Sequence, residues 1–467
     1  MLRFFRVNDP YRLLAILVLI ILFALPLLLT QPPLSVQELR HLLVGEAVSG
    51  GQTMYVQVYD STAPFAAGIY GAVDWLFGRS MPAREVLTIL LFFFQAAFFS
   101  ILLINNKAYN DNNYVPGVVF AILCFISYDF FSLSPELLGS TLLLLALNHL
   151  FREIEFRIQR EETILSLGVY LGAASIFVFS YSIFLFGTAL ILILFTRISL
   201  RKLLLLLLGF ALPHAILFLI YLRWDEAALL WQNFYLPNLS IATEPYMAWR
   251  SLFYLLAVPA AYFLIALFMM TREARFTKYQ SQLFQVMFLW LLFALAEAAI
   301  TRERSPHSFL TTLPSLTYFI SHYLLLIRRR WIAETMLWIF LGGILAIGHL
   351  ARLDRISAIN YAQLRLPVSQ VDEKTEGKKL MVLGRDITLY RHHALASYFL
   401  DWSLAEETVT DLSYYAHVLK VEEAFRTHPP DVVVDLESAM PAILNRIPAL
   451  QKRYRRDGST NHYYRIN

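Results

Sequence analysis

The charged residues that could do chemistry in the first 350 positions of this chain gather in two stretches. Glu38 and Asp60 stand in the long polar stretch between the first two apolar runs. Arg302 and Arg304 come shortly before His307, where another apolar run begins. Carboxylates can accept protons or hold cations, and arginines bind anionic groups such as phosphates. Ionisable groups at a membrane boundary are costly to place, so each of these is a functional candidate.

Further acidic residues are expected on the same side of the membrane. Asp129 and Glu136 flank a short turn between two apolar runs, and Glu297 lies near the end of the run that precedes the two arginines. Charged candidates from distant parts of the chain are therefore expected to converge on one membrane surface.

Apolar helices must position these residues. Of the 467 residues 58% are hydrophobic and only 16% are charged, whereas a soluble domain carries roughly a quarter charged residues. Runs long enough to cross about 30 Å of hydrocarbon recur along the first 350 positions. We expect about eleven spans, near 13–30, 83–105, 114–131, 135–150, 165–178, 180–196, 203–221, 251–270, 283–300, 308–327 and 331–350. The fifth and sixth are expected to form a hairpin that is interrupted at Ser180-Tyr181-Ser182.

The distribution of basic residues indicates the orientation. If the N-terminus is cytoplasmic, 16 Lys and Arg residues of the apolar part fall on the cytoplasmic side and 7 on the other. This asymmetry is the one that the positive-inside rule describes. An odd number of spans then places the C-terminal part outside the cytoplasm. Acidic residues show the opposite bias, because about twelve of 20 fall on the outer side, where we expect the chemistry.

The polar stretch 31–82 is far longer than a connection between two spans requires. Apolar residues recur at helical spacing from Val36 to Val48, which predicts an amphipathic helix on the membrane surface. The pair Gly50-Gly51 would end this helix, and Pro64 would open a second apolar helix that runs to Phe77.

Residues 351–467 have the composition of a soluble domain, with 31 charged residues among 117, against 43 in the first 350 positions. We therefore expect a transmembrane domain, 1–350, followed by a small extracytoplasmic α/β domain, 351–467. The strands expected in the second domain are 379–383, 432–435 and 462–466, and the helices are 394–405, 415–427 and 439–455.

Several functions lack their sequence signatures. There is no P-loop, G-x-G-x-x-G, H-E-x-x-H or G-x-S-x-G motif, which argues against ATP-driven transport, nicotinamide chemistry and zinc proteolysis. The formal net charge of +4 gives no reason to expect nucleic acid as a partner. The single Cys124 excludes an intramolecular disulfide and a cysteine metal cluster. No inverted repeat is evident, which weighs against a secondary transporter.

Three stretches together resemble one known family. The loop after the first span contains Gln37-Glu38, Gly50-Gly51, Tyr55 and Asp60-Ser-Thr-Ala-Pro64, followed by Leu76-Phe77-Gly78-Arg79. A late span begins with Ser305-Pro-His-Ser-Phe-Leu-Thr-Thr-Leu-Pro314. The tail contains Arg426-Thr-His-Pro-Pro-Asp-Val-Val-Val-Asp435 and ends in Tyr-Tyr-Arg-Ile before Asn467. In this order the three resemble the GT-C superfamily of integral-membrane glycosyltransferases, and in particular the bacterial mannosyl- and aminoarabinose-transferase-like proteins.

The resemblance implies an inverting enzyme of the inner membrane that takes a sugar from a polyprenyl-phosphate donor. Its acceptor would be a glycan, a lipid or a protein on the extracytoplasmic face. Glu38 would accept the proton of the acceptor hydroxyl, with Asp60 assisting. Arg302 and Arg304 would hold the departing phosphate, whose negative charge grows in the transition state.

Two further roles follow from the same resemblance. Glu136 and His307 would position the acceptor or a divalent cation such as Mg or Mn. One departure stands beside these matches: the family usually has a catalytic Asp at the place of Gln37, so that here only Glu38 remains of the acidic pair. Either Glu38 takes over, or the protein has lost transferase activity or uses a different acceptor chemistry.

Other functions stay open at this point. A non-enzymatic scaffold, such as a subunit of an envelope or secretion complex, would also be a multi-span protein with a polar outer domain, and Gln37 favours it slightly. A lipid-linked polysaccharide polymerase or ligase would place its long loop late in the chain, whereas here the loop follows the first span.

Overall fold

The structure is a computed structural model that describes residues 1–155, 161–196, 198–239, 244–273, 276–366, 377–396, 399–458 and 460–466. Mutual contacts divide the chain into two compact units. The first comprises Met1–Pro33, Pro82–Leu217 and Ile241–Leu364, and the second Leu34–Met81, Phe218–Ser240 and Arg365–Asn467. The composition of the sequence grouped the polar stretch 31–82 with the spans. The contacts instead place Leu34–Met81 in one unit with Arg365–Asn467. Four basic residues that entered the orientation count, Arg157, Arg160, Arg197 and Arg275, lie outside the described residues.

The protein is a multi-span membrane protein. Seven helices of the described chain are long and apolar enough to cross a membrane, or eight if one bent pair forms a single span. The seven are α2 (Arg12–Thr30), α5 (Met81–Asn105), α7 (Pro135–Ile154), α10 (Leu200–Arg223), α15 (Lys278–Ile300), η4 (Pro306–Thr312) with α16 (Leu313–Leu326), and α17 (Arg330–Arg352). The bent pair is α13 (Trp249–Leu255) with α14 (Ala257–Glu273), which meet at 62°.

The expected count of about eleven spans is not confirmed, although every expected span coincides with helix. The difference lies in α6 (Val115–Leu123), α8 (Glu161–Phe177) and α9 (Ile183–Phe195), which have 9, 17 and 13 residues. A straight span needs roughly 20 residues. The turn η2 (Phe179–Ser182) separates α8 from α9, at the interruption that the polar residues there predict.

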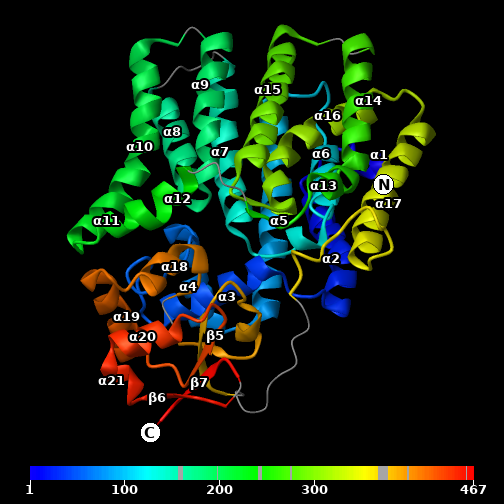
Figure 1. The fold of residues 1–467 in the computed structure, drawn as a ribbon. Coiled ribbons are helices and arrows are strands. Elements are labelled where there is room, and N and C mark those ends of the chain that lie inside the picture. The colour runs from blue at the N-terminus through cyan, green and yellow to red at the C-terminus, as the bar shows by residue number, and fades with distance from the viewer. Residues whose placement is uncertain are drawn as a thin grey trace. The chain divides into compact units, whose positions relative to one another are not determined.

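The first unit is held together by helix packing. Among its helices, α7 packs on α8, α14 on α16, α15 on α9, and α16 on α6; Figure 1 shows α9, α14 and α15 lying along a common direction. Its shorter elements are α1 (Leu2–Phe5), η1 (Tyr128–Phe130) and the two-stranded parallel pair β1 (Glu244–Pro245) and β2 (Glu303–Arg304). Of these short elements, η1 carries Asp129 and β2 carries Arg304.

Glycines allow α8 and α10 to approach each other closely. A Cβ atom on Gly168 would lie 2.3 Å from the carbonyl oxygen of Leu206, and one on Gly172 would lie 2.3 Å from that of Phe210. No side chain fits at either place, so the two backbones meet directly, as small residues permit in membrane helix pairs.

The second unit contains the two helices predicted for the first loop. Helix α3 (Val36–Ser49) begins at Ser35, whose hydroxyl accepts from the backbone N–H of Glu38, and it ends at Gly50. Helix α4 (Pro64–Phe77) begins with its proline and packs against α3. The same unit holds the short helices α11 (Ala227–Leu230), η3 (Trp231–Tyr235) and α12 (Leu236–Leu239).

The C-terminal part forms the expected small α/β fold, which is orange to red in Figure 1. Its sheet has the order β4-β3-β5-β7-β6, with β3 (Lys379–Leu383), β4 (Ala394–Leu395), β5 (Val432–Asp435), β6 (Tyr454–Arg456) and β7 (His462–Arg465). The helices are η5 (Thr388–Arg391), α18 (Trp402–Thr410), α19 (Tyr415–Thr427), α20 (Met440–Arg446) and α21 (Pro448–Gln451). The three expected strands and the helix 415–427 are confirmed.

Two expected helices are wrong in part. The stretch expected as helix 394–405 begins with β4, which pairs in parallel with β3, and helix starts only at Trp402; residues 397–398 lie outside the described chain. The helix expected at 439–455 is broken before Pro448, which lacks the N–H that helix continuation needs. Its last residues form β6, because they pair antiparallel with β7.

Backbone bonds fasten the first loop to the C-terminal part within the second unit. Leu366 donates its N–H to the carbonyl of Leu34 at 3.0 Å, and Asp401 donates to the carbonyl of Tyr59 at 2.8 Å. The Arg79 side chain donates to the carbonyl of Tyr390 at 2.8 Å. The loop is therefore a structured part of this unit.

The close approach of α8 and α10 makes a prediction about stability. Replacing Gly168→Ala would force the two backbones apart, and we expect it to cost about 1–3 kcal/mol, as overpacking does. The thermal midpoint of the purified protein in detergent should fall by several degrees. Gly342→Ala is the matched control, because a Cβ there has nothing within 4 Å. An unchanged midpoint in Gly168→Ala would contradict the packing.

Candidate functional site

Asp60 is the most deeply buried of the predicted site residues in the second unit, with 0% of its surface exposed. One oxygen, Oδ1, accepts from the backbone N–H of Thr62 at 2.8 Å. The other, Oδ2, lies 3.7 Å from Nε of Arg40 on α3. The structure thus joins Asp60 to the helix that carries Glu38, through an arginine on that helix.

Burial changes the acidity of this carboxyl group. Loss of water raises the pKa of Asp60 from 3.8 to about 6, since Arg40 and the hydrogen bonds with Thr62 offset only part of the cost and the charge of Asp401 adds to it. At neutral pH the group is still mostly ionised. A carboxylate of this kind holds Arg40 firmly, because either charge alone would be expensive to bury.

Glu38 and Gln37 occupy the first turn of α3. Glu38 is half-buried, while Gln37 has only 5% of its surface exposed. The N–H of Glu38 is bound by Ser35, so the residue is fixed at the helix N-terminus, where a negative charge is favoured. Of these two residues, Glu38 carries the carboxylate and is also the more exposed.

In the first unit, Arg302 and Arg304 lie on the segment between α15 and η4. The carbonyl of Arg304 accepts from the N–H of Tyr246, and its Nε donates to the carbonyl of Met247 at 3.5 Å. Its guanidinium lies over the ring of Trp249, 4.5 Å from the centroid. Partial burial lowers the pKa of Arg304, but an arginine stays charged at any physiological pH.

His307 opens η4 and is enclosed by polar groups. Its Nδ1 lies 2.8 Å from Oδ2 of Asp129, and its Nε2 lies 3.0 Å from Oγ of Ser132. The ring of Phe130 stacks on it, with the ring centres 6.2 Å apart. His307 and Asp129 are both almost fully buried, so the histidine is shielded from solvent.

Two more carboxylates lie close by in the same unit. Glu136 is half-buried in the first turn of α7, within electrostatic range of His307 and Asp129. Glu297 on α15 accepts from the hydroxyls of Ser180 at 2.6 Å and Thr311 at 3.3 Å. The convergence predicted for Asp129, Glu136 and His307 is therefore present, and Glu297 is bound by hydroxyl groups.

The predicted site residues fall into two groups. Glu38 and Asp60 belong to the second unit, and Arg302, Arg304, Glu136 and His307 belong to the first. Sequence reasoning missed Ser132, since a serine in a short turn carries no signal, and it did not select Arg40 as a site residue. A basic residue two positions after Glu38 on a helix was the available hint for Arg40.

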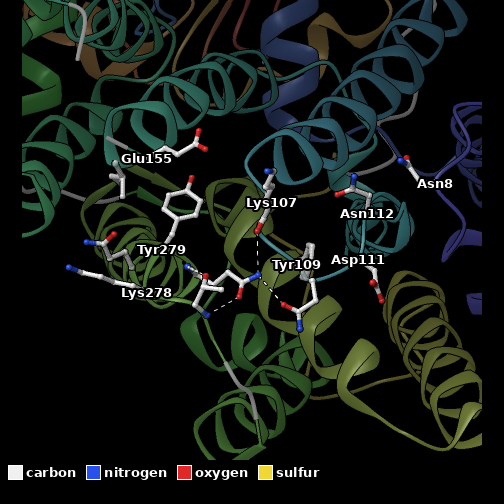
Figure 2. Close-up of a pocket in the computed structure, with 13 residues that line it drawn as sticks. Asn8, Lys107, Tyr109, Asp111, Asn112, Glu155, Lys278 and Tyr279 are labelled. Atoms are coloured by element: carbon white, nitrogen blue, oxygen red, sulfur yellow. Dashed lines mark hydrogen bonds between the residues drawn. The ribbon is translucent and has the colours of Figure 1, made fainter. Parts of the chain in front are cut away.

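No metal centre is evident in the part of the chain that the structure describes, where no cluster of three or more His, Cys, Asp or Glu side chains could hold an ion. The chain also has a cavity of about 1000 Å³ in its first unit, which Figure 2 shows. It is lined by polar residues that include Lys107, Asp111, Lys278 and Tyr279. None of the predicted site residues lines this cavity.

Comparison with known proteins shows the fold. No known family profile matches the sequence, and no curated protein matches it. Among solved structures, ArnT from Cupriavidus metallidurans bound to undecaprenyl phosphate matches with a TM-score of 0.56 and 11% identity, over 97% of this chain and 97% of ArnT. This chain has the fold of ArnT. ArnT in the apo state matches with a TM-score of 0.53 and 12% identity, over 92% of this chain and 94% of that one.

The apo oligosaccharyltransferase of Archaeoglobus fulgidus also matches, with a TM-score of 0.49 and 9% identity, over 91% of this chain and 69% of that chain. The expected GT-C resemblance is confirmed for the fold by the two ArnT structures. At such low identity the residues that do the chemistry do not follow from ArnT.

The raised pKa of Asp60 predicts how stability depends on pH. Between about pH 4 and 6 the folded protein keeps the Asp60 proton that the unfolded chain has lost, so stability falls as pH rises through this window. Asp60→Asn removes the effect. The difference in thermal midpoint, variant minus wild type, should rise from pH 4 to 6 and then level off. In unfolding free energy this change corresponds to roughly 3 kcal/mol at most. A difference that is constant or shrinks with pH would contradict the assignment.

Proposed function

We propose that the protein is a membrane glycosyltransferase that moves a sugar from a polyprenyl-phosphate donor to an acceptor on the extracytoplasmic face of the inner membrane. The fold match over 97% of both chains to ArnT, a protein seen with undecaprenyl phosphate bound, is the observation that carries the proposal. The charged groups that such a reaction needs are present in buried and half-buried positions. The orientation follows from the distribution of basic residues.

Glu38 is the proposed base. It takes the proton of the acceptor hydroxyl as the oxygen attacks the anomeric carbon, and the bond from that carbon to the phosphate oxygen breaks. Glu38 is half-buried, so part of its surface is accessible to a substrate, whereas Asp60 is fully buried. Asp60 therefore assists by fixing Arg40, which lies on α3 two residues after Glu38.

Arg302 and Arg304 are the proposed partners of the departing phosphate. The phosphate gains negative charge as the sugar leaves, and guanidinium groups stabilise this charge most when they are already fixed in place. Arg304 meets this condition, because Met247 and Trp249 hold its side chain.

Glu136 is the proposed acceptor-positioning group, together with His307. A divalent cation such as Mg or Mn could take part through Glu136. His307 is less suited as a ligand, since both of its ring nitrogens already face Asp129 and Ser132.

Gln37 is the observation that favours a second function. It is buried at the place where the resembling family has its catalytic acid, and a scaffold protein in an envelope complex would need no acid there. Such a protein would bind stoichiometric protein partners and no polyprenyl phosphate.

Substitution of Glu38 tests the proposal. Purified protein in nanodiscs is given decaprenyl phosphate carrying mannose or aminoarabinose, together with lipid and glycan acceptors, and release of decaprenyl phosphate is measured. We expect Glu38→Gln to lower turnover at least about 100-fold, because a general base contributes 10²–10⁴. Asp60→Asn should lower it less. Glu46→Gln, on the same helix, is the matched control and should stay within about threefold of wild type.

Two results would count against the proposal. Normal turnover in Glu38→Gln would remove Glu38 as the base. A wild-type protein that neither releases nor binds decaprenyl phosphate, but co-purifies with protein partners, would favour the scaffold function.

A further inference from the structure

A buried pair joins two turns of the first unit. Asp129 lies in η1 and His307 in η4, and 2.8 Å separates the carboxylate oxygen from the ring nitrogen. The two side chains are 0% and 2% exposed. Replacing such a pair by apolar residues is often neutral or stabilising, so stability alone gives little reason for an ionic link at this position.

Polar groups face both ring nitrogens of His307. The Ser132 hydroxyl donates to the carbonyl of Asp129 at 3.0 Å, so its oxygen accepts from Nε2 of His307. Nδ1 lies 2.8 Å from the carboxylate of Asp129. The ring therefore has a polar group from the turn 129–132 next to each of its nitrogens.

His307 is connected to the arginine segment by very little chain. Ser305 and Pro306 separate it from Arg304, and Ser305 forms a capping box with Ser308 that fixes the start of η4. Arg304 itself lies in β2, which is held by its short pairing with β1. His307 is thus a buried residue, with polar groups at both ring nitrogens, close to the two arginines on their C-terminal side.

We propose that Asp129 is a positioning residue for the donor phosphate: by holding His307, it fixes the segment that carries Arg302 and Arg304. The inference deepens the proposed function and rests on it. Asp129 itself does not contact the substrate and acts through His307. Phe130 and Ser132, which flank the same turn, complete the hold on the ring.

Direct lipid binding tests the inference without requiring turnover. The dissociation constant of the full-length protein for decaprenyl phosphate is measured in nanodiscs for wild type, Asp129→Asn, Arg304→Gln and the double variant. We expect each single variant to raise it about tenfold, as loss of one buried polar contact does. Because both substitutions act through the same arginine segment, the dissociation constant of the double variant should rise by far less than a hundredfold. Glu161→Gln, an exposed carboxylate at the start of α8, should bind within twofold of wild type.

Ser132→Ala covers the case in which Asp129→Asn fails to fold. It removes one of the two holds on His307 and should raise the dissociation constant a few-fold. The inference is overturned if Asp129→Asn binds decaprenyl phosphate like wild type; if that variant does not fold, the same result for Ser132→Ala overturns it. It is also overturned if Arg304→Gln binds like wild type, or if the dissociation constant of the double variant rises by the product of the two single effects. If the wild-type protein binds no decaprenyl phosphate, the proposed function fails as well. If wild type binds it and only the variants behave otherwise than expected, the inference about Asp129 fails alone.

Discussion

A charge that is buried in an apolar chain must meet a partner, and this constraint accounts for most of the polar structure of the protein. An unpaired ion in a low-dielectric interior costs several kcal/mol even after relaxation. The described chain meets the constraint repeatedly: Asp60 with Arg40, Asp129 with His307, Glu153 with Lys202, and the N-terminal ammonium with Glu334. Each pair joins segments that are distant in sequence, apart from the first.

The first loop shows how such links build a domain. Helix α3 carries Glu38 and Arg40, and the carbonyl of Tyr59 accepts from the backbone N–H of Asp401 in the C-terminal part. The guanidinium of Arg79 binds the carbonyl of Tyr390 and lies 3.4 Å from Glu46. A loop of this size costs little extra entropy to close once its ends are fixed, and these contacts fix the helix that carries the candidate residue Glu38.

Fold and site give different kinds of support to the function. The fold match to ArnT supports the proposal of a polyprenyl-phosphate donor, whereas the residues proposed to act on the donor are argued from this chain alone. Glu38 is half-buried at the start of α3, and the guanidinium of Arg304 lies over the ring of Trp249. Gln37 is the feature that the transferase proposal explains least well.

Much of the fold could be predicted from the sequence because it depends on local pattern. Apolar runs place the spans, helical spacing and Pro64 place α3 and α4, and β-branched residues place β5. Two expected helices failed, since Pro448 interrupts one and short-range pattern does not reveal that 454–456 will pair with a distant strand. Candidate site residues could be named from the sequence, but the side chains that they contact could not.

The sequence by itself determined a multi-span protein with a small α/β tail, because hydrophobic length and charge density are properties of the chain. It also selected Glu38, Asp60 and His307 as candidates, since polar groups are rare in such a chain. Only the tertiary structure decided that Arg40 neutralises Asp60 and that Asp129 and Ser132 hold His307. Partner choice depends on which distant segments pack together, and packing depends on the whole chain.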